Sequence, residues 1–358
     1  MTTTDSESPF QGNQPKNTGE LAAWHSRTRH ENVIDPELVI IDPHHHLFDA
    51  PARGQRYLLP DLLSDISGGH NITATVYVEA YHSMWRRIGP PEMRAVGEVE
   101  FAAGVAAMAE SGTYGDCRVA AAMVSHADLR LGERVDEVLQ AQQERSGGRL
   151  RGIRQQVAYE PGHIGSFIMD RAPEHLMLDT QFQRGFARLA RLGLSFDVWA
   201  YHTQLAEVQQ LASRFPDTTI ILNHVGGVMG VADYCHRRDE IFAYWRNVMK
   251  TLVPHKNVKI KVGGMGMAVF GFGFEQRDTP PSSAALAQAW KPYIETCIEI
   301  FGPQRCMFES NFPVDKQSCG YTELWNAFKL VTRSLSASER ASLFSQTALN
   351  TYRIESLE

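Results

Sequence analysis

The chain has 358 residues, of which 43% are hydrophobic and 21% charged, and its formal net charge at pH 7 is −6. These values are typical of a globular protein with a large core, and they give no electrostatic reason to expect nucleic acid or an anionic membrane as partner. No stretch approaches the roughly 18 consecutive apolar residues of a membrane span, and the first residues lack the basic and apolar segments of a signal peptide. We therefore expect a small molecule as the partner.

The five cysteines are scattered and odd in number, and none forms a C-x-x-C pair. This pattern favours reduced thiols and a cytoplasmic setting. The first residues, 1 to about 20, are polar and predict a mobile tail, and Gly19–His30 predicts a short helix. We accordingly expect residues 1–37 to form a tail with a helix and residues 38–354 to form one domain.

From Leu38 onward, short apolar runs alternate with longer amphipathic segments. The runs predict eight strands, over Leu38–Asp42, Ile72–Glu79, Arg118–Val124, Gly152–Gln155, Ser195–Trp199, Thr219–Asn223, Val258–Val262 and Cys306–Glu309. Segments with a period near 3.6 predict helices over Val96–Glu110, Leu131–Glu144, Thr180–Leu192, Gln204–Phe215, Tyr234–Leu252, Ala284–Phe301 and Tyr321–Leu335. This alternation predicts a (β/α)8 TIM barrel, with a doubly wound open sheet as the alternative. No G-x-G-x-x-G motif supports a dinucleotide site.

The segments that follow several predicted strands are long, notably Ala80–Arg94, Val157–Asp179 and Gly263–Ser283. In a barrel, strand-to-helix loops build the active site at the carboxyl ends of the strands. We therefore expect the functional residues there, and we expect the glycine-interleaved segment Phe270–Phe274 to form an apolar lid.

The first strand ends in two histidines, His44 and His46, spaced i and i+2. Residues two apart in a strand point to one face, so both imidazoles converge on one point, whereas His45 faces away and is expected to be structural. Neutral imidazole is the commonest protein metal ligand. The pair therefore predicts a metal-assisted hydrolase.

Polar side chains also end most of the other predicted strands. A carboxylate at the end of a buried strand, as at Glu79, needs a cation or a donor network, so a site role and a structural ion pair are both open. Arg154 and Lys261 carry the same ambiguity between a salt bridge and recognition of a substrate carboxylate. The full set of candidates beside the first-strand histidines is Tyr77, Glu79, Arg154, His202, His224, Lys261, Glu309 and Asn311.

Four motifs, in this order along the chain, resemble the amidohydrolase superfamily. They are Ile41-Asp42-Pro43-His44-His45-His46-Leu47-Phe48, Gly152-Ile153-Arg154-Gln155, Ile221-Leu222-Asn223-His224-Val225-Gly226 and Met307-Phe308-Glu309-Ser310-Asn311-Phe312-Pro313. The resemblance covers about Leu38 to Ile354. It is to the amidohydrolase-2 branch, which contains sugar lactonases, 2-pyrone-4,6-dicarboxylate lactonase and related decarboxylases.

The resemblance implies a divalent cation, zinc or manganese, beside His44 and His46, with His224 helping to hold the metal or the substrate. The last strand of the family normally ends Ser-Asp-x-Pro, and its aspartate binds metal and takes a proton from the attacking water. Here that position is Asn311, whose amide oxygen is able to coordinate a cation but cannot act as a base near neutral pH.

Three interpretations follow from Asn311. A neighbouring carboxylate substitutes for the aspartate, namely Glu309, Glu79 or Asp315; or the protein works without metal, with Asn311 and His224 polarising a carbonyl; or hydrolysis is lost.

We predict a hydrolase that opens a lactone or similar cyclic ester of a small, carboxylated catabolic intermediate. In this prediction Glu309, Glu79, Asn311 and His224 are catalytic, and His44, His46, His224 and Asn311 hold the metal. Arg154, Lys261, His202 and Tyr77 contact the substrate. The alternatives are a metal-dependent decarboxylase of the same branch and a barrel that only binds a ligand. A homodimer is the expected assembly.

Overall fold

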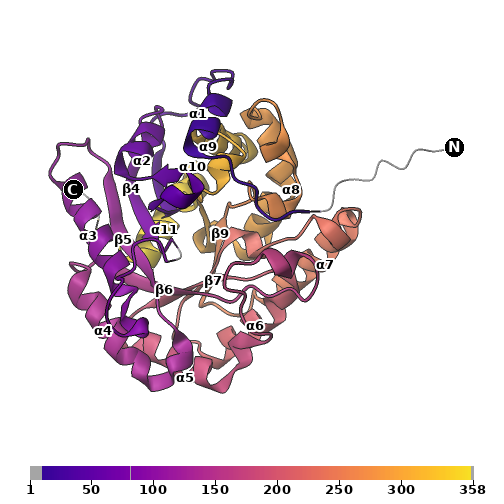
Figure 1. The fold of residues 1–358 in the computed structure, drawn as a ribbon. Coiled ribbons are helices and arrows are strands. Elements are labelled where there is room, and N and C mark those ends of the chain that lie inside the picture. The colour runs from indigo at the N-terminus through magenta and orange to yellow at the C-terminus, as the bar shows by residue number, and fades with distance from the viewer. Residues whose placement is uncertain (1–9, 81, 356–358) are drawn as a thin grey trace.

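The computed structural model describes residues 10–80 and 82–355, and an eight-stranded parallel sheet forms its centre. Figure 1 shows the strands surrounded by helices. Sheet neighbours follow chain order, and all pair in parallel. The strands are β1 (Val39–His45), β4 (Asn71–Val78), β5 (Arg118–His126), β6 (Leu150–Gln156), β7 (Ser195–Trp199), β8 (Ile220–Leu222), β9 (Val258–Val262) and β10 (Cys306–Phe308).

The sheet closes on itself just beyond the end of β10. His45 forms a parallel bridge with Phe312, the His46 N–H donates to the Phe312 carbonyl at 2.7 Å, and the Asn311 N–H donates to the His44 carbonyl at 2.9 Å. These contacts complete a (β/α)8 barrel, as the alternation of strands and helices predicts. The closing seam is made by the same residues that carry the first and last sequence motifs.

The predicted helices are present, with differences at their ends. The helix predicted from Leu131 begins at Val135, because Gly132 at φ 60° interrupts a preceding 3-10 segment. Side-chain caps begin two others: Asp179 accepts from the Phe182 N–H, and Ser282 accepts from the Ala285 N–H. The helices are α1 (Thr18–His25), α2 (Leu59–Ile66), α3 (Val96–Glu110), α4 (Val135–Arg145), α5 (Thr180–Arg191), α6 (Leu205–Arg214), α7 (Arg238–Thr251), α8 (Ser283–Phe301), α9 (Tyr321–Val331), α10 (Ala337–Ala341) and α11 (Thr347–Tyr352).

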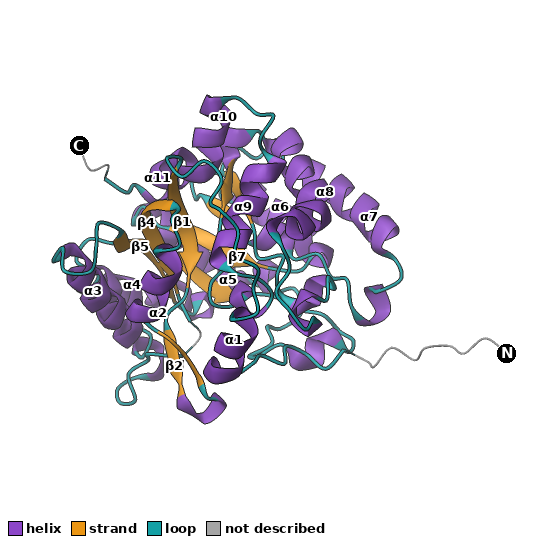
Figure 2. Cartoon of the chain, turned by 90° about the horizontal axis from the view of Figure 1, so that it is seen from above, coloured by secondary structure: helices purple, strands orange, loops and turns teal. Residues whose placement is uncertain are grey.

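The C-terminal helix α11 closes one end of the barrel. Tyr352 belongs to the buried cluster inside the barrel, together with Val76, Val124 and Met307. Figure 2 shows α10 and α11 at one end of the molecule and the short strand β2 (Phe48–Ala50) with α1 at the other; β2 pairs with β3 (Gln55–Tyr57). Because β2 follows the carboxyl end of β1, the open end of the barrel is the one that carries the strand-to-helix loops.

The segment before the barrel packs on these loops. A capping box between Asn17 and Glu20 begins α1, and the Trp24 indole N–H donates to the Arg277 carbonyl at 2.7 Å. The Lys16 ammonium donates to the Glu275 carbonyl at 2.7 Å. The expected mobile tail falls partly on residues 1–9, which lie outside the described residues, and the part from Lys16 onward contacts the loop after β9.

The segment expected to form an apolar lid packs into the body of the protein. Phe270 and Phe274 are buried, and the Phe274 ring meets Trp290 edge to face. The Arg238 guanidinium lies over the Phe272 ring at 4.6 Å from its centroid. These rings are thus held by α7 and α8, and the role of the segment as an apolar lid stays a prediction. Within the described ranges no helix has both the length and the apolarity needed to cross a bilayer.

Candidate active site

The two histidines of the first motif lie fully inside the open end of the barrel. His44 and His46 are buried, and their Nε2 atoms are 3.2 Å apart. Asp42 fixes this part of β1, because its Oδ1 accepts from the backbone N–H of His44 at 3.3 Å and of Ser310 at 3.0 Å. Burial raises the pKa of Asp42 to about 6. The side chains therefore converge as the period-2 spacing predicts.

The hydrogen bonds of His46 define which ring nitrogen is free. Its Nδ1 lies 2.9 Å from the Val78 carbonyl and 3.0 Å from the Glu79 carbonyl, so Nδ1 carries the proton and Nε2 keeps its lone pair. Burial holds the pKa values of His44 and His46 well below the usual range, and neighbouring cations add to this effect. Both imidazoles are therefore neutral, which is the form that binds metal.

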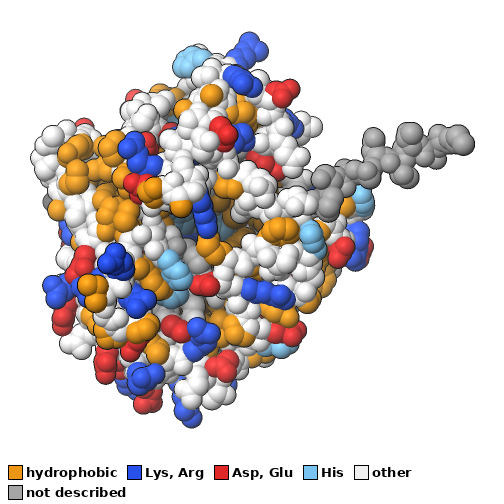
Figure 3. Space-filling view, viewed as in Figure 1, with side chains coloured by type: hydrophobic (Ala, Val, Ile, Leu, Met, Phe, Trp, Pro, Cys, Tyr) orange, Lys and Arg blue, Asp and Glu red, His pale blue; other side chains and the backbone are white. Residues whose placement is uncertain are grey.

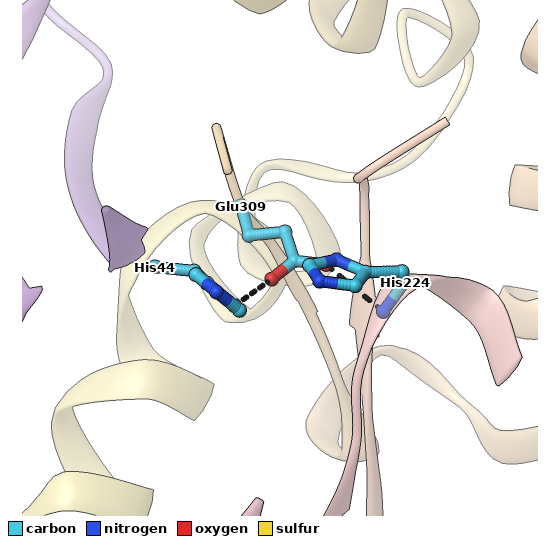
Figure 4. Close-up of side chains that lie close together, drawn as sticks. All are labelled: His44, His224 and Glu309. Atoms are coloured by element: carbon cyan, nitrogen blue, oxygen red, sulfur yellow. Dashed lines mark hydrogen bonds and ion pairs between the residues drawn. The ribbon is translucent and has the colours of Figure 1, made fainter. Parts of the chain in front are cut away.

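Glu309 lies between the histidines of β1 and of the loop after β8 (Figure 4). Its Oε1 accepts from the backbone N–H and from Nδ1 of His224, at 3.1 and 2.8 Å. Its Oε2 lies 2.6 Å from Nδ1 of His44, is buried, and has no hydrogen-bond partner in the described part of the chain. A buried carboxylate oxygen this close to an imidazole nitrogen favours a proton at that point, and a neutral His44 that binds a cation through Nε2 carries its proton on Nδ1.

Local backbone geometry places His224 and Asn311. They have φ values of 53° and 55°, in the left-handed region that non-glycine residues rarely adopt. A Cβ on Gly264 would lie 2.2 Å from Nδ1 of His224, so only glycine leaves room for this ring. The loops after β8, β9 and β10 are thus built around the imidazole.

Arg154 and Glu79 form an ion pair beside the histidines. The Arg154 Nε donates to Glu79 Oε1 at 2.6 Å, and Nη2 donates to the Glu79 carbonyl at 2.7 Å. The Nη1 of the same guanidinium is 3.3 Å from Nε2 of His44. Of the two roles left open for these residues, the structure shows the ion pair directly, and it places the guanidinium at the histidine cluster.

Lys261 is also paired. Its ammonium donates to Asp197 Oδ1 at 2.7 Å and lies 3.4 Å from Nδ1 of His44. Lys261 and Asp197 are completely buried, and the Tyr352 hydroxyl is 3.0 Å from both oxygens of Asp197. This network lies beneath the histidines and above the helix that closes the barrel.

Asn311 occupies the position where the family motif has aspartate. Its Nδ2 donates to Asp315 Oδ1 at 2.8 Å, and the other oxygen of Asp315 accepts from the Gly266 N–H at 2.8 Å. Burial raises the pKa of Asp315 to about 8, so this carboxyl is largely protonated at neutral pH. Asp315 is therefore a poor substitute for the missing base.

Tyr77 differs from the expectation that it contacts substrate beside the cluster, whereas the same expectation for His202 stays a prediction. Val76 and Val78 take the positions inside the barrel, so Tyr77 faces the helix layer, and its hydroxyl donates to Glu98 at 2.7 Å. His202 accepts from the Met229 N–H at 3.3 Å. His45 faces away from the other histidines, as predicted, with its Nε2 2.8 Å from the Thr75 hydroxyl.

His126, at the end of β5, is not among the site residues predicted from the sequence. The third barrel strand was expected to end at Val124, but β5 continues to His126, which pairs in register with Arg154. The sequence does contain a signal for this residue, because two polar residues, Ser125 and His126, follow the apolar run of the strand.

The arrangement fits a divalent cation. Ligand atoms of His44, His224 and Glu309 all lie within 4.8 Å of one another. The 3.2 Å between Nε2 of His44 and Nε2 of His46 is close to the roughly 3.3 Å expected between two nitrogens bound to one tetrahedral zinc ion. The Arg154 guanidinium and the neutral amide of Asn311 both lower the expected affinity.

Comparison with known proteins agrees with this geometry. The family model described as amidohydrolase matches residues 41–354, so the chain belongs to the amidohydrolase family. The resemblance seen in the four motifs is thereby confirmed.

Two curated relatives and one solved structure are similar to this chain. An uncharacterised protein of Sinorhizobium fredii is 32% identical over 345 residues, covering 89% of this chain and 99% of its own. An L-fucono-1,5-lactonase of Burkholderia multivorans is 29% identical over 236 residues, covering 65% of this chain and 72% of its own. A crystal structure of a Burkholderia multivorans amidohydrolase with bound Zn is 24% identical, has a TM-score of 0.67, and covers 88% of this chain and 100% of its own. Family membership and these relatives support a hydrolytic enzyme.

Proposed function

We propose that this enzyme hydrolyses a small lactone, opening the cyclic ester by attack of water. The observation that carries the proposal is the buried carboxylate of Glu309, held by His224 through Oε1, while Oε2 faces His44 without a hydrogen bond. Such an oxygen is placed to receive a proton from water at the centre of the cluster. The lactonase relative supports the ester as the bond that is broken.

Charge pairing selects Glu309 over the other carboxylates as the residue that handles the proton. Glu79 accepts from the Arg154 guanidinium, and Asp315 is held by Asn311 and carries a proton near neutral pH. The first interpretation of the Asn311 position, in which a neighbouring carboxylate replaces the family aspartate, is therefore the one the geometry favours.

His44, His46 and His224 would hold the divalent cation, with the Glu309 carboxylate beside them. When bound, the cation supplies Lewis-acid polarisation of an ester carbonyl and lowers the pKa of water. The guanidinium of Arg154, 3.3 Å from His44 Nε2, would orient the carbonyl oxygen of the substrate.

The substrate in this proposal is uncharged. Arg154 and Lys261 were expected to hold a substrate carboxylate, but each cation already meets a carboxylate of the protein at 2.6 to 2.7 Å. An added anion would compete with these pairs. A neutral, hydroxylated lactone needs no free cation, so it fits the observed pairing better than a carboxylated one.

The test is a panel of esters assayed by acid release in weak buffer, comprising L-fucono-1,5-lactone, δ-valerolactone and 2-pyrone-4,6-dicarboxylate. We expect turnover of the neutral lactones, and a loss of about 100-fold or more in Glu309→Gln, because a general base contributes about 10²–10⁴-fold. Glu240→Gln, in the exposed ion pair with Arg237, is the matched control and keeps full activity. Unchanged turnover in Glu309→Gln would contradict the proposal, and release of CO2 from aromatic acids without ester hydrolysis would favour the decarboxylase.

A further inference from the structure

A cavity of about 450 Å³ opens on the face that carries the strand-to-helix loops. Its walls come from the loops after β4, β5 and β6, and include Trp85, His126 and Gln156. Figure 3 shows this face of the molecule, with a hollow near its middle where histidine side chains are visible. The cavity has the size of a small-molecule site.

His126 links this cavity to the site where the ester is cleaved. It shares a strand face with Val124, which lies in the cluster inside the barrel, so its side chain points toward the barrel mouth. It pairs in register with Arg154, about 4.8 Å away across the sheet, and Arg154 reaches His44. A ligand in contact with His126 is thus one strand away from Arg154 and two strands away from His44.

Several polar side chains of the cavity wall form hydrogen bonds with other residues of the protein. Arg130 donates through Nε and Nη2 to the two oxygens of Asp128, and Gln155 donates to Asp128 as well. The Trp85 indole N–H donates to Glu98 at 3.0 Å. These contacts fix the side chains of Arg130, Gln155 and Trp85 in the wall.

The ring of His126 is different. In the described part of the chain neither of its ring nitrogens has a hydrogen-bond partner, although the ring packs against Trp85, with 5.1 Å between centroids. Burial lowers the pKa of His126, so the imidazole is neutral and offers one donor and one acceptor. A hydroxyl group satisfies both functions, because it also donates and accepts.

We propose that His126 and the cavity beside it bind the hydroxylated part of the substrate ring, with Trp85 as the wall against which that ring packs. Arg130 pairs with Asp128, Asp170 lies 3.5 Å from His82, and Glu92 and Arg171 also line the cavity. Acidic and basic groups are thus both present in the wall, which suits a ring without net charge. This inference rests on the proposed lactone hydrolysis. In this proposal His126 contributes to substrate selectivity and takes no part in proton transfer.

The experiment compares two lactones that share a six-membered ring but differ in hydroxyl groups, L-fucono-1,5-lactone and δ-valerolactone, in wild type and His126→Phe. The phenyl ring keeps the packing on Trp85 and removes both hydrogen bonds. We expect kcat/KM to fall about tenfold or more for the hydroxylated lactone, mainly through KM, because the substitution removes a hydrogen bond and leaves a ligand hydroxyl unpaired. The value for δ-valerolactone changes less than about threefold.

His126→Asn partly restores KM for the hydroxylated lactone, and His255→Gln, at the opposite end of the barrel, is the matched control. An equal fall for both lactones, or no fall for either, would overturn the assignment of His126. If the wild type hydrolyses neither lactone, the proposed function fails, and binding of L-fucose, measured by ligand-observed NMR, tests the cavity alone. Loss of that binding in His126→Phe supports the cavity assignment, and binding equal in both proteins, or absent from both, overturns it.

Discussion

The side chain of Asn311 donates a hydrogen bond to Asp315 Oδ1 at 2.8 Å, four residues further along the chain. Both residues are buried, and the left-handed backbone of Asn311 turns its side chain toward this partner. The amide at the family's aspartate position is therefore part of a hydrogen-bond network that includes a carboxyl with a raised pKa.

Replacing the amide changes both metal affinity and stability. In Asn311→Asp the new carboxylate adds a negative charge beside the cluster, so we expect affinity for zinc to rise at least about tenfold, since this charge is worth more than ~1.4 kcal/mol at the dielectric of a protein site. Without metal the variant is less stable than wild type, because two carboxyl groups, at positions 311 and 315, then face each other where the amide of Asn311 donated a hydrogen bond. Competition with a chelating dye measures the affinity, and Asn311→Ala is the control. Equal affinity in wild type and Asn311→Asp would mean that residue 311 does not touch the ion.

Replacing one member of the buried Lys261–Asp197 pair is expected to lower the free energy of unfolding more than replacing both. Lys261→Met leaves the Asp197 carboxylate without its cation, and we expect the free energy of unfolding to fall by about 3–5 kcal/mol. Lys261→Met/Asp197→Asn removes both charges and recovers part of the loss. Urea unfolding of both variants measures the difference. A double variant no more stable than the single one would show that the pair is not coupled.

His45 predicts a pH dependence of stability. Burial lowers its pKa from the usual value near 6.5 to about 3. Between these pH values the unfolded chain binds a proton at residue 45 and the folded protein does not, so the free energy of unfolding falls on acidification by up to ~1.4 kcal/mol per pH unit.

The matched variant is His45→Gln, which removes this titration. From pH 7 to pH 5, wild type is expected to lose up to about 2 kcal/mol more stability than the variant, because the acidification covers about 1.5 pH units below the usual histidine pKa. Urea unfolding at the two pH values checks it. Parallel losses in the two proteins would rule out His45 as the source.

The barrel and much of its site follow from periodicity alone. His44 and His46 share a face because they are two residues apart in a strand, and His224 and Glu309 follow apolar runs that end at the same rim. The structure brings these four residues together.

Partners across the barrel were not predictable in this way. Glu79 pairs with Arg154 from a strand two positions away in the sheet, and Lys261 pairs with Asp197 in the same way. Both pairings depend on how far each strand is shifted along the barrel axis once the barrel closes. Tyr77 lies in a strand that is buried on both faces, so the alternation of polar and apolar residues does not reveal which face is inside.

In the proposed function, His44 and His46 hold a cation on which hydrolysis depends. Metal content of protein purified without added metal, measured by inductively coupled plasma mass spectrometry, tests it in wild type, His44→Ala/His46→Ala and His45→Gln. We predict near-stoichiometric zinc or manganese in wild type and in His45→Gln, because the ring of His45 faces away from the cluster. The double variant is expected to lose both the bound metal and the lactone hydrolysis. Full hydrolytic activity in metal-free wild-type protein would show that hydrolysis does not depend on a cation held by these histidines.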